Sequence, residues 1–149
     1  MKKILTILIF AIAILPGCQT VPDNIPEDMT PMEFFQRGQE EVEADNLEAA
    51  LMYYETFLDR YPNDYANAII AEYWVAFIQH KKGKKAESVK LFHELLSKEA
   101  ELSGRVPEWP FVLSRRVLEE MGEPVNVKDE AAADNATSAE EATETGQDQ

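Results

Sequence analysis

Apolar side chains recur at steps of three and four residues through the middle of the chain. This spacing marks one face of an α-helix, because each helical turn takes 3.6 residues. The pattern occurs twice, which predicts two amphipathic helices that bury similar faces. The two sets are Leu47, Ala50, Leu51, Tyr54, Phe57 and Leu58, and then Val89, Phe92, Leu95 and Leu96.

Signals for helix starts and stops punctuate the same region. Thr30 and Glu33 enclose Pro31 in the pattern of a capping box, so a helix begins there. Asp45 is the predicted cap of the next helix, and Gly83 is the predicted left-handed end of the third. Pro62 is the predicted stop of the second helix, and Asn63 or Asp64 is the predicted cap of the third. The last helix is predicted to end at Gly122 and Pro124. The sequence predicts an all-α fold with helices at about 31–44, 46–61, 65–82, 84–100 and 110–121.

The first residues have the pattern of an export signal. Lys2 and Lys3 precede an apolar run over residues 4–15, which is too short to span a bilayer. The run closes at Leu15-Pro16-Gly17-Cys18, and Cys18 is the only cysteine of the chain. We therefore expect residues 1–17 to be a signal peptide.

This segment resembles the bacterial lipobox, in which a diacylglyceryl group is attached to the cysteine and the peptide is cut before it. The resemblance implies a lipoprotein with acyl chains, such as palmitate, at Cys18. It also implies a lipid-anchored protein of the bacterial cell envelope. Gln19 favours the outer membrane and its periplasmic side, since Asp at that place is the inner-membrane signal.

Composition sets the flanks apart from the helical region. Residues 18–30 are predicted to be a lipidated cysteine and a flexible linker, because acids and prolines dominate them. Residues 123–149 are predicted to be a disordered acidic tail. The whole chain carries a formal net charge of −14, and removal of Lys2 and Lys3 makes it two charges more negative. Nucleic acid is therefore excluded as an expected partner.

The helical domain at 31–122 resembles tetratricopeptide (TPR) repeats. Residues 31–64 match the motif at the small residues Gly38 and Ala50, the aromatic Tyr54 and the stop at Pro62, with Phe34 in place of the opening Trp. The second copy matches at Ala76, Gly83, Ser88, Phe92 and Leu95. The resemblance implies a short α-solenoid of two helical hairpins plus a capping helix. The same residues are also similar to the repeats of outer-membrane assembly lipoproteins.

Few residues of the sequence are candidates for metal binding or catalysis. His80 and His93 are the only histidines, and they fall on different predicted helices without a metal-ligand spacing. We expect both at the surface, no metal, no cofactor and no enzyme activity. The run from His80 to Lys85 is the one basic spot, either a solvated helix end or a site for an acidic partner or anionic lipid.

Tyr73, Trp74 and Phe77 occupy more faces of the third helix than one core stripe needs. In tetratricopeptide domains the first helix of each repeat lines a concave groove. That resemblance places Phe35, Gln39, Val42, Tyr73, Phe77 and His80 in a groove that binds a peptide or helix. Ordinary core packing of the same rings is the alternative.

The sequence thus predicts a membrane-anchored periplasmic protein that mediates protein–protein interaction, with a role in envelope assembly or transport. The alternative is a structural spacer or surface antigen without a dedicated ligand. So short a stack buries little surface, and a protein partner in the cell envelope or a second copy of the chain would complete it.

Overall fold

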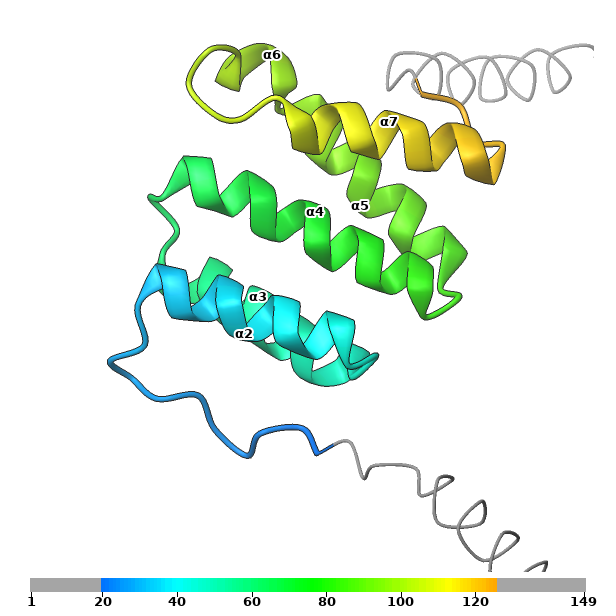
Figure 1. The fold of residues 1–149 in the computed structure, drawn as a ribbon. Coiled ribbons are helices and arrows are strands. Elements are labelled where there is room, and N and C mark those ends of the chain that lie inside the picture. The colour runs from blue at the N-terminus through cyan, green and yellow to red at the C-terminus, as the bar shows by residue number, and fades with distance from the viewer. Residues whose placement is uncertain (1–19, 126–149) are drawn as a thin grey trace, which may run out of the picture.

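The computed structural model describes residues 20–125, and every regular element among them is a helix. The elements are α2 (Pro31–Glu43), α3 (Leu47–Arg60), α4 (Tyr65–Lys81), α5 (Lys85–Ser97), α6 (Glu99–Leu102) and α7 (Trp109–Met121) (Figure 1). The expectation of an all-α fold is confirmed. No helix within residues 20–125 is long and apolar enough to cross a membrane.

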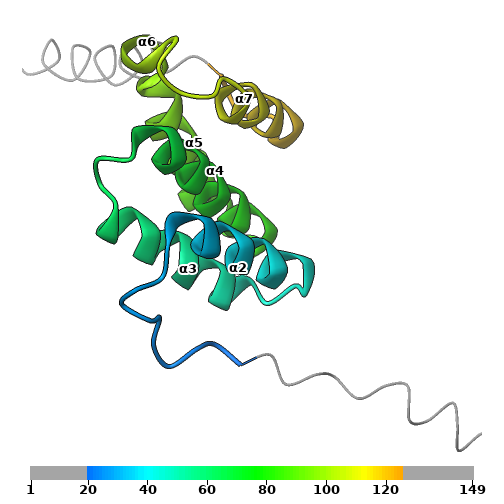
Figure 2. The ribbon, with the colours of Figure 1, turned by 60° about the vertical axis from the view of Figure 1, so that its left-hand side comes forward.

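The helices form two layers of antiparallel hairpins. Helices α2 and α3 pair with each other, α4 and α5 form the next hairpin, and α7 packs on both α4 and α5. Figure 1 shows α2, α4 and α7 in the front layer, with α3 and α5 behind them; Figure 2 shows the same stack from the side. We call the exposed side of α2, α4 and α7 the front face.

Local signals explain most helix ends. Thr30 N donates to Glu33 Oε2 at 2.8 Å while Glu33 N donates to Thr30 Oγ1 at 3.4 Å, so the capping box is formed. Asp64 caps α4 by accepting from Asn67 N at 3.3 Å. Gly83 follows α4 with φ of 75°, a left-handed conformation that is open to glycine without strain.

Two predicted ends were wrong. Asp45 does not cap α3, because it adopts φ of 57° in the turn and Asn46 takes the cap position. The fourth helix does not continue to Ala100. It ends at Ser97, and the short α6 turns the chain toward α7.

The core consists of two clusters joined by shared side chains. The first fills the α2–α3 hairpin around Phe34, Tyr54 and Phe57, and the second fills the space between α4, α5 and α7 around Phe92 and Phe111. Trp74 and Leu91 pack against both clusters. The hairpins therefore share one continuous interior.

Small residues set how closely the helices approach. A Cβ built on Gly38 would lie 2.6 Å from Cζ of Tyr54, so only glycine fits beneath that ring. Ala50 on α3 and Ala76 on α4 are fully buried. Ser88 of α5 is also fully buried, and its Oγ donates to the Ala76 carbonyl at 3.0 Å.

The segment 20–30 is not the free linker that its composition predicted. Ile25 is only 6% exposed within the first cluster, and Arg60 donates to the carbonyls of Ile25 and Pro26. Tyr61 Oη donates to the Met29 carbonyl at 2.8 Å. We call residues 20–30 the strap. It runs along the side of the α2–α3 hairpin that faces away from α5 and α7 (Figures 1 and 2).

The predicted tail is also ordered at its start. Glu123 forms an ion pair with Lys85 at 2.7 Å, and Val125 packs against the second cluster. The rest of the predicted tail, 126–149, lies outside the described residues, as do the signal peptide and Cys18.

Candidate functional site

The six residues predicted to line a groove lie on α2 and α4 of the front layer. Phe35 is half-buried, with its ring centroid 5.7 Å from Tyr54 and 5.0 Å from Phe57. Val42 is half-buried against the first cluster, and Gln39 is exposed. These α2 residues can therefore line a groove and still pack partly on α3.

On α4 the predicted residues divide into half-buried and buried members. Phe77 and His80 are half-buried, with ring centroids 6.4 Å apart. Tyr73 is only 6% exposed and belongs to the second core cluster. Burial raises the pKa of the Tyr73 hydroxyl, and the charge of Glu120 adds to that shift. Tyr73 supports the front face from beneath rather than forming its surface.

Aromatic contacts connect the two hairpins through the interior, by way of the fully buried Tyr54 of α3. Tyr54 stacks on Trp74 with centroids 5.9 Å apart and an interplanar angle of 7°. Trp74 in turn meets Phe77 edge-on at 5.8 Å. Together with the Phe35–Tyr54 contact, this gives an unbroken series of rings from α2 to α4.

Helix α7 extends the series. Trp109, at the first position of α7, meets Tyr73 edge-on with centroids 5.3 Å apart. Its side chain is 39% exposed, more than most large apolar residues of the fold. We call the partly exposed rings of Phe35, Trp74, Phe77 and Trp109 the aromatic row. The predicted capping helix, 110–121, begins one residue after Trp109, and the position of this ring beside Pro110 at a helix start was the available signal.

The lysines of the basic run form ion pairs with acidic residues of the same chain. Lys81 pairs with Asp45 at 3.3 Å, and Lys82 pairs with Glu48 at 2.6 Å. Lys84 and Lys85 pair with Glu87 and Glu123. The hydrogen bond from Lys82 lowers the pKa of Glu48. The run therefore ties the α4–α5 turn to the α2–α3 turn and to the end of α7.

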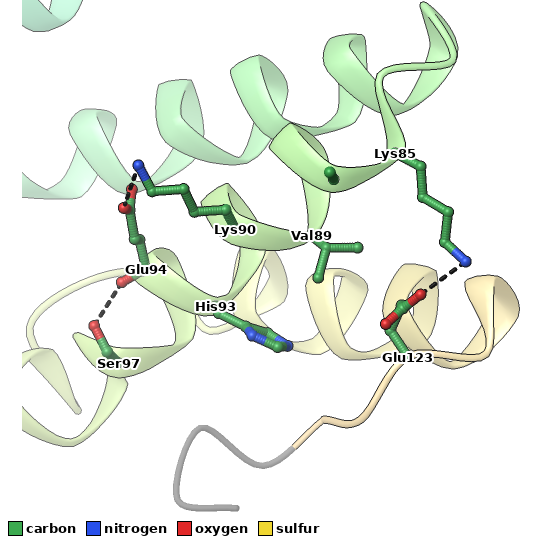
Figure 3. A pocket seen from close by; sticks show the side chains of 8 residues that line it. Lys85, Val89, Lys90, His93, Glu94, Ser97 and Glu123 are labelled. Atoms are coloured by element: carbon green, nitrogen blue, oxygen red, sulfur yellow. Dashed lines mark hydrogen bonds and ion pairs between the residues drawn. The ribbon is translucent and has the colours of Figure 1, made fainter. Parts of the chain in front are cut away.

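A cavity of about 730 Å³ lies on the back layer. It follows α5 and is bounded at one end by Glu123, as Figure 3 shows. Its lining residues are Lys85, Ala86, Val89, Lys90, His93, Glu94, Ser97 and Glu123. We call it the α5 cavity.

His93 is not at the surface as expected. It is 7% exposed, and its Nε2 lies 2.9 Å from the Pro124 carbonyl, which fixes the chain after α7. His80 lies on α4, away from this contact. Within residues 20–125, no three His, Cys, Asp or Glu side chains gather in a way that could hold a metal ion.

Comparisons with known proteins add one relative. An uncharacterized protein of Treponema pallidum (strain Nichols) is 35% identical over 96 residues, which is 62% of this chain and 38% of that protein. The chain therefore matches well under half of the relative's length. No family model matches the chain, and no solved structure matches it.

Proposed function

We propose that this chain is a lipid-anchored tetratricopeptide-type protein of the bacterial cell envelope that binds a partner protein through the aromatic row. The observation that carries the proposal is the series of ring contacts from Phe35 on α2 to Trp109 on α7. Partly buried aromatic rings lose little conformational entropy on binding and offer large apolar area, so they often dominate protein interfaces.

The packing supports the repeat assignment. Three predicted motif positions hold small residues at close helix contacts: Gly38 lies beneath the Tyr54 ring, and Ala50 and Ser88 are fully buried. The two hairpins stack in sequence, and α7 continues the front layer as a capping helix would. Anchoring rests on Leu15-Pro16-Gly17-Cys18, and mass spectrometry of the mature N-terminus tests it directly.

The binding test compares three single substitutions. Phe77→Ala removes a half-buried ring of the front face and should weaken partner capture from detergent-solubilised envelope by more than ~1 kcal/mol, about fivefold. Val89→Ala is the matched control, because Val89 is half-buried on α5 and lines the α5 cavity instead. Tyr73→Ala is the stability control, since it should lower the melting temperature through loss of core packing.

The capture results distinguish binding at the front face from binding at the α5 cavity. Capture lost with Phe77→Ala but kept with Val89→Ala, at unchanged helical content, supports binding at the front face. Capture lost only with Val89→Ala would move the binding site to the α5 cavity and refute the proposed surface.

The second candidate is a structural spacer without a dedicated ligand. One observation favours it: Trp109 covers Tyr73, so the chain itself fills part of the front face. Equal capture of all partners by the unsubstituted chain and by a variant with both Phe35→Ala and Phe77→Ala would favour the spacer.

A further inference from the structure

The strap holds the folded domain close to the lipid attachment site. Asn46 Nδ2 donates to the Thr20 carbonyl at 3.3 Å, and the same amide donates to Glu41 Oε2 at 2.7 Å. Asn46 is only 6% exposed and sits at the start of α3, so this contact belongs to the folded body. Thr20 is separated from Cys18 by one residue, and two residues cover at most about 7 Å of chain.

A second, stronger attachment lies further along the strap. The Ile25 side chain is buried in the first cluster, and Arg60 donates to two consecutive carbonyls at Ile25 and Pro26. The guanidinium also lies over the Phe34 ring, 5.5 Å from its centroid. The strap is thus fixed by burial of the Ile25 side chain and by hydrogen bonds from the Arg60 guanidinium, which packs on the Phe34 ring.

We infer that the membrane that receives the lipid lies against the α2–α3 end of the domain, with α7 farthest from it. The inference rests on the proposed lipidation of Cys18. The strap and α7 lie at opposite ends of the stack in both views (Figures 1 and 2). With 8–10 Å between packed helices, two steps place α7 roughly 20 Å beyond the first hairpin.

Charge does not produce this orientation. The lysines near the α2–α3 end are paired with Asp45 and Glu48, so they present no uncompensated positive surface to anionic headgroups. The short tether alone sets the position. Phosphatidylcholine vesicles, which carry no net charge, therefore isolate the effect of the tether. The orientation also leaves the front face open to the side, where a partner can reach the aromatic row.

Fluorescent labels on single cysteines test the inference, because lipidated Cys18 leaves no other thiol in the chain. Glu43→Cys lies near the α2–α3 turn, and Ser103→Cys lies after α6 at the other end; both positions are exposed. The full lipidated protein is reconstituted in phosphatidylcholine vesicles that carry a nitroxide on some headgroups. Quenching at position 43 should exceed quenching at position 103 several-fold.

Two variants separate the tether from other causes. A flexible Gly-Ser insert of about eight residues between Gln19 and Thr20 adds roughly 16 Å of reach without touching any contact, and it should bring the two quenching values close together. Asn46→Ala removes the Thr20 contact while α3 keeps its backbone cap, since the Asn46 side chain makes no cap hydrogen bond. It should reduce the difference more weakly than the insert does.

The outcomes are distinguishable from failure of the proposed function. Mass spectrometry that finds a free thiol at Cys18 would overturn both the anchoring and the orientation. A confirmed lipid with equal quenching at positions 43 and 103 would overturn the orientation alone. An unchanged quenching difference after the Gly-Ser insert would also overturn it, because the tether would then not set the position.

Discussion

Gly38→Ala tests the closest helix approach in the fold. The added Cβ would lie 2.6, 2.8 and 3.0 Å from three ring atoms of Tyr54, where van der Waals contact needs more than 3.4 Å. The ring cannot move aside easily, because Tyr54 is fully buried between Phe35 and the stacked Trp74. Overpacking of this kind costs about 1–3 kcal/mol.

Helix propensity opposes that cost. Alanine favours a helix interior over glycine by about 1 kcal/mol. At the middle of the steric range the variant should lose about 1 kcal/mol of unfolding free energy. In a domain of this size, that lowers the melting temperature by at least about 4 °C. Circular dichroism during thermal and urea unfolding measures both quantities.

A double-mutant cycle gives the decisive result. When Tyr54→Leu removes the ring, Gly38→Ala should become neutral or stabilising by up to about 1 kcal/mol, so its sign reverses. Gln39→Ala, at the next and exposed position of α2, is the control and should stay within about 0.5 kcal/mol. A Gly38→Ala variant that raises the melting temperature with Tyr54 present would refute the steric clash between these two positions.

Three further substitutions probe other parts of the fold. Tyr54→Phe should stabilise the protein by about 1 kcal/mol, because the buried Tyr54 hydroxyl has no hydrogen-bond partner within residues 20–125, and calorimetry that finds a clear loss would contradict this. Burial also raises the pKa of Tyr54 above its usual 10.0, so stability should be full below pH 10 and fall by about 1.4 kcal/mol per pH unit above it, a loss that Tyr54→Phe should reduce. Ala50→Arg should cost several kcal/mol and unfold the domain, since it places an unpaired charge at a fully buried site; an unchanged melt would show that the helix register is wrong. Ile25→Ala should cost about 2 kcal/mol or more if the strap packs as described, whereas a free linker would give no change in urea midpoint.

The helices could be predicted from the sequence because their signals are local. The capping box at Thr30 and the left-handed end at Gly83 depend on neighbouring residues alone. The apolar faces of α3 and α5 follow from spacing in the same way. The cap at Asp45 failed because a competing local geometry, φ of 57°, was available to that residue in the turn.

The strap could not be predicted because its order comes from distant residues. Only Val21, Ile25 and Met29 are clearly apolar among its acids and prolines, too few to indicate a packed segment by composition. Arg60 and Tyr61, more than thirty residues away in sequence, supply the donors that hold it. The burial of His93 has the same origin, since its partner Pro124 lies beyond α7.

The binding surface on α2 and α4 stays a prediction. The choice of α2 and α4 came from the repeat resemblance, and Phe35 and Phe77 are half-buried there. Helical spacing did not separate Tyr73 from Phe77, because both lie on one side of α4 with their rings stacked 5.9 Å apart. Which ring is covered depends on Trp109, whose position is set by the path of the chain through α6.

Site-specific photocrosslinking in living cells tests the central claim most directly. A benzophenone amino acid replaces Phe77 or Trp109 on the front face and, separately, exposed Lys90 on α5, in the full-length chain. Binding through the aromatic row predicts the same crosslinked partner from positions 77 and 109, and none from position 90. A partner crosslinked from position 90 but from neither front-face position would contradict it.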